Sequence, residues 1–138
     1  MSEPSWACRG IRGAVLADAD TPQAIHEATR ELLEAMIAAN GVRQEDVASV
    51  IFTVTQDLTQ AYPATAARQI GWYDTALLTA LEMSPPGSPP RCIRVLILWN
   101  TPLSQKDIQH IYIRGAECLR PDRAANDGSD QTNTTVLT

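Results

Sequence analysis

The residue whose chemistry stands out most in this sequence is Arg94, in the middle of the apolar segment Cys92–Trp99. A guanidinium keeps its proton at physiological pH, so burying it among apolar side chains costs free energy unless an anion or several acceptors contact it. The partner could be an Asp or Glu of the same protein. It could also be a ligand oxyanion, because the planar fork of arginine matches a carboxylate. We favour the ligand and keep the internal ion pair as the alternative.

Three further arginines are placed where a ligand could reach them. Arg12 lies within Gly10–Gly13, whose glycines lack side chains and leave room beside it. Arg68 follows an aromatic–proline step on a predicted short helix, and Arg120 directly precedes a proline. Each of the three alone is more often a solvated surface arginine, and base composition alone can produce an arginine-rich chain. The prediction of an anion site therefore rests first on Arg94.

No acid–base or covalent chemistry is evident beside these arginines. Glu82 ends a predicted strand, where a carboxylate usually lies at a sheet edge, and Tyr112 has the setting of a core residue. Neither His26 nor His110 has a serine, cysteine or carboxylate at a spacing that predicts a triad. The sequence has no glycine-rich phosphate loop and no metal-binding motif, so we expect no metal and no cofactor. The cysteines are expected in strands as small apolar residues without a nucleophilic role, at Cys8, Cys92 and Cys118.

A mixed sheet with one long helix is predicted to position these residues. Thr21-Pro22 forms a helix start and Asn40-Gly41 a helix end. The buried stripe expected between them is Ile25, Ala28, Leu32, Met36 and Ala39. Strands are expected at Trp6–Leu16, Ala48–Thr55, Thr75–Leu81, Cys92–Trp99 and His110–Cys118. Short helices are expected at Pro63–Gly71 and after Ser104, and a loop at Ser84–Pro90. This order predicts an α+β domain with a mixed five-stranded sheet packed against one long helix plus short helices.

The predicted strand Cys92–Trp99 is apolar on both of its faces. One face would carry Ile93, Val95, Ile97 and Trp99, and the other Cys92, Leu96 and Leu98 beside Arg94. One long helix covers only one face of a sheet. We therefore expect the other face to contact a second subunit in a homo-oligomer.

Length and charge narrow the class of protein. A chain of 138 residues should form one domain, over residues 1–122, followed by a polar and mobile tail at 123–138. Its net charge of −5 argues against partners such as nucleic acid or an anionic membrane. The longest apolar runs are far shorter than a membrane span, and the first residues lack the basic and apolar regions of a secretory signal. An odd number of cysteines without ligand spacing fits reduced thiols. We therefore expect a cytoplasmic protein.

Short motifs spread along the chain form an ordered set. They are Arg9-Gly-Ile-Arg-Gly-Ala14, Asp57-Leu58, Pro63-Ala64, Arg68 with Gly71-Trp72, Glu82-Met83, Cys92-Ile-Arg-Val95, His110-Ile-Tyr112 and Leu119-Arg-Pro-Asp122. This set resembles the small, monofunctional chorismate mutases, whose three subunits assemble as a pseudo-α/β barrel with active sites between neighbours. The resemblance implies conversion of chorismate to prephenate by a Claisen-type rearrangement within one molecule. Such a reaction needs no nucleophile, metal or proton transfer; it needs a held shape and a stabilised charge.

The resemblance also implies a role for each candidate residue. Arg94 would face the ether oxygen of the substrate, where negative charge grows as the C–O bond breaks, and Arg12 would bind a carboxylate near that oxygen. Tyr112 would contact a carboxylate, and Glu82 would accept a hydrogen bond from the ring hydroxyl without acting as a base. Arg120 would close over the ring carboxylate. The neighbouring subunit would contribute Tyr62, Ala64 and Arg68. The rest of the implied substrate-binding set is Thr65, Leu78, Thr79 and Leu119.

Three positions depart from the pattern of that family. Tyr62 stands where many relatives have phenylalanine, Thr79 where cysteine is common, and Thr65 where lysine is common. The Thr79 hydroxyl could still bond to the substrate hydroxyl, whereas Thr65 removes a positive charge near the mouth of the pocket. The departures at Thr65 and Thr79 bear on substrate affinity more than on reaction type.

Two other functions stay open from the sequence. An imine or enamine deaminase on a similar trimeric plan would also use an interfacial arginine, but it does not call for Glu82 and Arg120-Pro121. A non-catalytic module that binds carboxylate metabolites would keep Arg12 and Tyr112 but would not need Arg94 beside an ether oxygen. Loss of chorismate absorbance with purified protein and no added cofactor separates an enzyme from a binding module.

Overall fold

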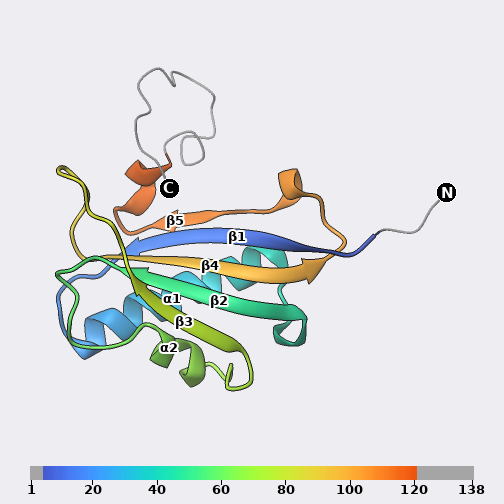
Figure 1. The fold of residues 1–138 in the computed structure, drawn as a ribbon, viewed down its shortest axis with the longest axis horizontal. Helices are drawn as coiled ribbons and strands as arrows, with labels where there is room; N and C mark the ends of the chain where they lie inside the picture. Colours follow the sequence, from blue (N-terminus) through green and yellow to red (C-terminus); the bar gives the residue numbers. More distant parts are fainter. Residues whose placement is uncertain (1–4, 121–138) are drawn as a thin grey trace, which may run out of the picture.

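The computed structural model describes residues 5–120, which form one five-stranded mixed sheet with a long helix on one side (Figure 1). The strands are β1 (Ala7–Leu16), β2 (Val47–Val54), β3 (Ala76–Leu81), β4 (Cys92–Thr101) and β5 (Ile111–Ile113). The helices are α1 (Pro22–Asn40) and α2 (Ala64–Gln69), with short 3-10 turns at Gln44–Asp46, Gln105–Asp107 and Ala116–Leu119. The strand order is β3-β2-β4-β1-β5. β4 runs antiparallel to β2 and β1, whereas β2 and β3, and β1 and β5, are parallel pairs. The predicted α+β architecture is confirmed.

The ends of helix α1 follow from its sequence. The hydroxyl of Thr21 accepts a hydrogen bond from the backbone N–H of Ala24 at 3.1 Å, and Pro22 begins the first turn. Gly41 closes the helix with a φ of 71°, a left-handed conformation that glycine adopts at little cost. The buried stripe is Ile25, Ala28, Thr29, Leu32, Leu33 and Met36. Ala39, expected on this stripe, is instead exposed; in the last turn of α1 the half-buried residues are Ile37 and Asn40, and Asn40 donates to the carbonyls of Met36 and Gln109.

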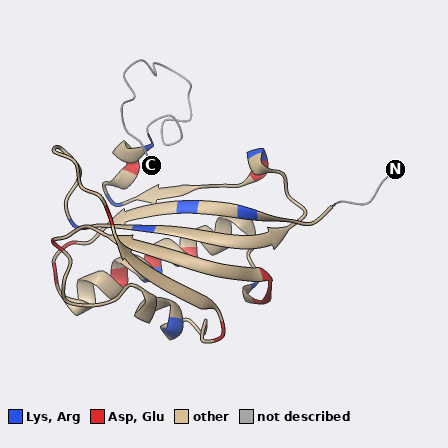
Figure 2. Ribbon diagram, viewed as in Figure 1, with Lys and Arg blue, Asp and Glu red and all other residues tan. Residues whose placement is uncertain are grey.

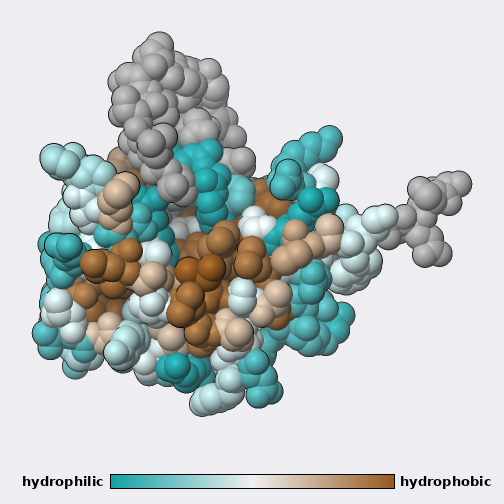
Figure 3. Space-filling model, in the orientation of Figure 1, coloured by the Kyte–Doolittle hydropathy of each residue, from teal (hydrophilic) through white to brown (hydrophobic). Residues whose placement is uncertain are grey.

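The two faces of the sheet differ in what covers them. On the face against α1, the side chains of Ile93, Val95, Ile97 and Trp99 are all at most 4% exposed and join one core with Ile11, Val50 and Phe52. Burying each of these large side chains stabilises the fold by about 1.5–3 kcal/mol. The opposite face, here called the open face, presents Arg12, Leu78, Arg94, Leu96 and Leu98. Figure 3 shows apolar side chains gathered over the strands on the side turned away from α1. Among the described residues, β4 therefore carries apolar side chains on both of its faces, as the sequence predicts.

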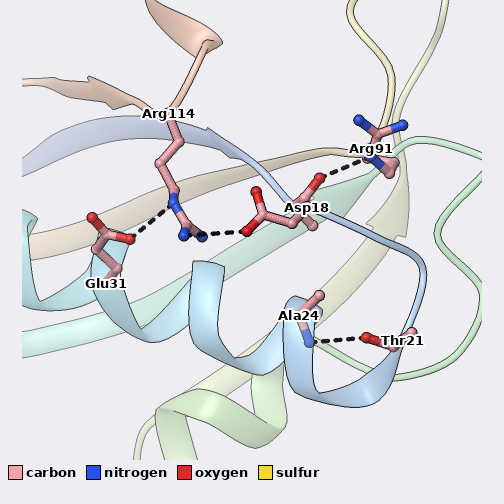
Figure 4. A network of polar contacts seen from close by, with 7 residues as sticks. Asp18, Thr21, Ala24, Glu31, Arg91 and Arg114 are labelled. Carbon is pink, nitrogen blue, oxygen red and sulfur yellow. Dashed lines mark hydrogen bonds and ion pairs between the residues drawn. The ribbon is translucent and has the colours of Figure 1, made fainter.

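The last strand is shorter than predicted, so the expected strand His110–Cys118 is wrong beyond Ile113. Arg114 has a φ of 55° and Gly115 a φ of 94°, and two such residues in succession cannot continue a strand. The chain turns there into the 3-10 turn Ala116–Leu119, so Cys118 is exposed and lies outside any strand. The Arg114 side chain holds the turn against α1, with its guanidinium 3.2 Å from Glu31 and 3.5 Å from Asp18 (Figure 4).

Other strand and helix ends agree with the sequence prediction within two residues. The predicted domain end at Asp122 and the predicted mobile tail after it lie outside the described residues. No helix within residues 5–120 is both long and apolar enough to span a bilayer.

The two glycines beside Arg12 have different roles, which corrects the expectation that both leave room for a ligand. Gly13 faces α1, where a Cβ would lie 2.5 Å from the sulfur of Met36 and 3.0 Å from Cδ1 of Leu32. The space beside Gly13 is therefore filled by the helix. Gly10 faces the open face, where the nearest atom to a Cβ would be a methyl of Leu96 at 3.2 Å.

Gly13→Ala is expected to destabilise the protein by about 1–3 kcal/mol, because the new methyl overlaps side chains of a closely packed core. The free energy of unfolding, measured by urea denaturation, checks this. Gly10→Ala is the matched control on the same strand and should cost clearly less, since the Leu96 side chain can move. Equal losses for the two variants would contradict this account of Gly13.

Candidate active site

The register of the sheet brings Arg94 and Tyr112 into one row on the open face. Arg94 lies directly opposite Thr53 of β2 on one side and Ala14 of β1 on the other, and Ala14 in turn lies opposite Tyr112 of β5. Residues opposite one another in adjacent strands point to the same face. Arg94 and Tyr112 are thus two strand spacings apart, about 10 Å. Ala14 between them is fully buried and packs with Tyr112, Ala116 and Leu119.

Arg12 lies one row further along the same face. It is opposite Leu96 in β4, and with Gly10, Leu96, Gln105 and His110 it lines a hollow of about 350 Å³. Figure 2 shows basic residues along β1 and near the beginning of β4, whereas the acidic residues lie on α1 and in loops and turns. The open face therefore combines apolar surface with positive charge, a combination suited to an apolar anion.

His110 holds the strand that carries Arg12. The backbone N–H of Arg12 donates to Nδ1 of His110 at 2.9 Å, which requires that nitrogen to be unprotonated. No local pattern in the sequence assigns His110 a role. Its place immediately before β5, together with the parallel pairing of β5 and β1, would have brought it beside Arg12.

Glu82 approaches Arg94 from the end of β3. Its backbone N–H donates to the carbonyl of Val54 at 2.8 Å, which extends the pairing of β3 with β2 by one residue. Its carboxylate Oε1 lies 3.6 Å from Nε of Arg94 and accepts a hydrogen bond from the Thr53 hydroxyl at 2.5 Å. The side chains of Arg94 and Glu82 are 18% and 20% exposed. The internal ion pair that the sequence left open is therefore present, but at 3.6 Å it is too long for a hydrogen bond.

The Arg94 Nε atom is the notable polar group of this cluster. It is buried and makes no hydrogen bond within the described part of the protein. A buried N–H of a cation without an acceptor is costly. The contact with Glu82 offsets part of that cost electrostatically but does not supply a hydrogen bond.

Cys92 lies on the same face, two residues before Arg94, and is almost fully buried. Burial raises the pKa of its thiol to about 11, and the positive charge of Arg94 opposes this only in part. At neutral pH the side chain is therefore a neutral thiol. The expectation that Cys92 has no nucleophilic role is consistent with this setting.

The residues expected from the neighbouring subunit lie apart from Arg94 and Arg12. Tyr62 is 71% exposed and lines a separate hollow of about 300 Å³ together with Thr79 and the loop before α2. Ala64 is buried at the start of α2, Thr65 is half-buried and Arg68 is exposed. We call Tyr62, Ala64, Thr65 and Arg68 the α2 cluster, and Arg12, Glu82, Arg94 and Tyr112 the sheet-face cluster.

The other expected site residues lie in different parts of the structure. Leu78 is 62% exposed on the open face, in the row of Leu96 and Arg12, whereas Thr79 points to the opposite side of β3 beside the Tyr62 hollow. Leu119 is buried in a small cluster with Tyr112, Ala14 and Cys92. Arg120 is half-buried and is the last described residue. Within residues 5–120, Arg12 and Tyr62 thus line two different hollows, one on the open face and one beside α2. Residues 5–120 contain no group of three or more His, Cys, Asp or Glu side chains placed to hold a metal ion.

The raised pKa of Cys92 predicts slow reaction with thiol reagents. In a Cys8→Ser/Cys118→Ser variant, which keeps only Cys92, modification at pH 8 should be far slower than in the unfolded chain, because the reactive thiolate is scarce three pH units below its pKa. The rate should rise steeply as the pH approaches 11. Rapid labelling of the folded variant at pH 8 would contradict the buried neutral thiol.

Comparison with known proteins places this geometry in a family. The profile of the family described as chorismate mutase type I matches residues 8–123. The chain is 59% identical to chorismate mutase AroH of Thermus thermophilus, over 83% of this chain and 94% of the relative, and 37% identical to chorismate mutase AroH of Bacillus subtilis, over 83% and 91%. A solved chorismate mutase from Clostridium thermocellum superposes with a TM-score of 0.77 at 45% identity, covering 78% of this chain and 96% of that one. The chain belongs to the type I chorismate mutase family.

Proposed function

We propose that this protein converts chorismate to prephenate, as an isomerase of aromatic amino acid biosynthesis in the cytoplasm. Family membership and the names of the relatives support the reaction. The observation that carries the proposal within this chain is the buried Nε of Arg94. It is a fixed cationic donor without a hydrogen-bond acceptor among the described residues, on a face that also presents apolar surface.

The charge of Arg94 is proposed to lower the barrier of the rearrangement. As the C–O bond of the substrate breaks, negative charge develops on the ether oxygen, so a cation beside that oxygen binds the transition state more tightly than the substrate. Arg94 is suited to this because β4 is held on both sides by antiparallel partners, β1 and β2. A donor on a central strand needs little reorganisation at the moment of reaction.

The other members of the sheet-face cluster are proposed to hold the substrate in its reactive shape. Arg12 and Tyr112 would bind carboxylate groups of the substrate, with Arg120 closing over the ring carboxylate. Glu82 would accept a hydrogen bond from the ring hydroxyl and would not act as a base. Holding both ends of the breaking and forming bonds close together supplies much of the acceleration for a reaction within one molecule.

A homotrimer is proposed to complete the site. The open face leaves Leu78, Leu96 and Leu98 partly or largely exposed, and a second subunit would cover them. The α2 cluster would then come from the neighbouring subunit to meet the sheet-face cluster. Thr65 and Thr79 would affect how tightly the substrate binds, because the first carries no charge and the second offers only a hydroxyl.

The two alternative functions are less well supported. A trimeric imine or enamine deaminase does not account for a family match across residues 8–123. A binding module without activity would use the carboxylate contacts of Arg12 and Tyr112, but it has no use for an unpaired donor at Arg94. Formation of prephenate by the purified protein separates catalysis from binding.

Arg94→Ala is expected to lower kcat more than the roughly 10²–10³-fold loss typical of removing one oxyanion donor, because a full charge is lost. The loss of chorismate absorbance with purified protein and no cofactor measures it. Arg30→Ala is the matched control, since Arg30 is exposed on the solvent side of α1, and it should retain normal turnover. Near-normal turnover in Arg94→Ala would refute the proposed mechanism.

Mixing two inactive variants tests whether the site is shared between subunits. Arg94→Ala disables the sheet-face cluster, and Arg68→Ala disables the α2 cluster; each cluster is half of the proposed shared site. If the two proteins are unfolded together and refolded as mixed trimers, roughly a quarter of the interfaces should combine two intact halves. The mixture should therefore regain activity well above that of either variant refolded alone. Activity equal to the mean of the two variants would place the whole site within one chain.

A further inference from the structure

Thr53 lies at the centre of the polar contacts around Arg94. It is half-buried on β2, directly opposite Arg94 in β4 and Ala80 in β3. Its hydroxyl donates to Oε1 of Glu82 at 2.5 Å. This is the same carboxylate oxygen that lies 3.6 Å from Nε of Arg94. One oxygen atom is therefore shared between a close neutral donor and a more distant cationic one.

The longer distance to the cation calls for a physical reason. A hydrogen bond between a guanidinium and a carboxylate is normally 2.7–2.9 Å and about twice as strong as one between neutral groups. Glu82 nevertheless remains 3.6 Å from Arg94 Nε. It is held at two points, by its backbone N–H on the carbonyl of Val54 and by its carboxylate on Thr53. These two bonds set where Oε1 can lie.

We infer that Thr53 is a positioning residue, whose hydroxyl holds the Glu82 carboxylate back and so keeps the Arg94 guanidinium out of a tight ion pair and able to turn toward the substrate oxygen. The inference rests on the proposed function. If the carboxylate closed on Nε, a tight ion pair would hold the guanidinium that has to meet the charge developing on the ether oxygen. The same closure would turn Glu82 away from the ring hydroxyl. Thr53 acts through Glu82 and Arg94 without touching the substrate.

Three substitutions at this position separate the hydroxyl from the shape of the side chain. Thr53→Val removes the hydroxyl and keeps the branched shape, and Thr53→Ser keeps the hydroxyl. Thr53→Val should lower kcat/KM roughly 10- to 100-fold, the scale of one hydrogen bond to a charged group. Thr53→Ser should remain within about threefold of the wild type, since it retains that bond. Thr53→Ala also lacks the hydroxyl but has a smaller side chain, and it should lower kcat/KM as much as Thr53→Val does. It replaces Thr53→Val in the test if the valine variant does not fold.

A double-mutant cycle distinguishes positioning from a general loss of structure. In a Glu82→Ala background there is no carboxylate to hold, so adding Thr53→Val should change kcat/KM by less than about twofold. Ser49→Ala is the matched control, because Ser49 lies on the same strand and face as Thr53, four residues away, and should behave as the wild type. A loss from Thr53→Val that is equally large with and without Glu82 would overturn the inference. So would wild-type activity in Thr53→Val.

Crystal structures of the unliganded wild type and Thr53→Val decide the geometry without any assay. The distance from Arg94 Nε to Glu82 Oε1 should shorten to a hydrogen bond, about 3.2 Å or less, in the variant and should stay longer in the wild type. An unchanged distance in the variant would overturn the inference. If the wild type does not convert chorismate, the proposed function fails, and this distance still shows whether Thr53 positions the pair.

Discussion

The positive charge of Arg94 on the central strand of an otherwise apolar sheet is the constraint on which the site depends. A guanidinium cannot be neutralised there, so the surrounding residues have to accommodate it. Glu82 offsets the charge from 3.6 Å without forming a hydrogen bond. Cys92 stays a neutral thiol beside it. The result is a cation whose energetic cost is only partly met within the described chain, and an anionic ligand is the natural means of meeting the rest.

The two faces of the sheet have different roles: one forms the stabilising core, and the other carries the proposed site. Against α1, the core is closed, and even Gly13 is needed to let the helix approach. The open face combines exposed leucines with the sheet-face cluster, while the α2 cluster lies elsewhere among the described residues. Under the proposed trimer, a single contact would both bury the apolar surface and bring the two clusters together. Assembly and catalysis would then depend on the same interface.

Much of this organisation could be predicted from sequence, and the exceptions share a physical cause. The ends of α1 follow from local signals at Thr21 and Gly41, and the two-sided character of β4 follows from alternation along one strand. The contact of Thr53 with Glu82 and that of His110 with Arg12 depend on register between strands distant in sequence, which no local pattern specifies. The early end of β5 has a different cause. The Arg114-Gly115 pair is a local turn signal, but the apolar residues around it favoured the prediction of a longer strand.

The most direct test of the central claim is the fate of chorismate incubated with the purified wild-type protein in buffer that contains a chelator and no cofactor. We expect steady conversion to prephenate, one molecule formed for each molecule consumed, because the fixed charge of Arg94 and the held shape of the substrate suffice for the reaction. Chorismate that binds without being converted, or conversion that stops when the chelator is added, would contradict it.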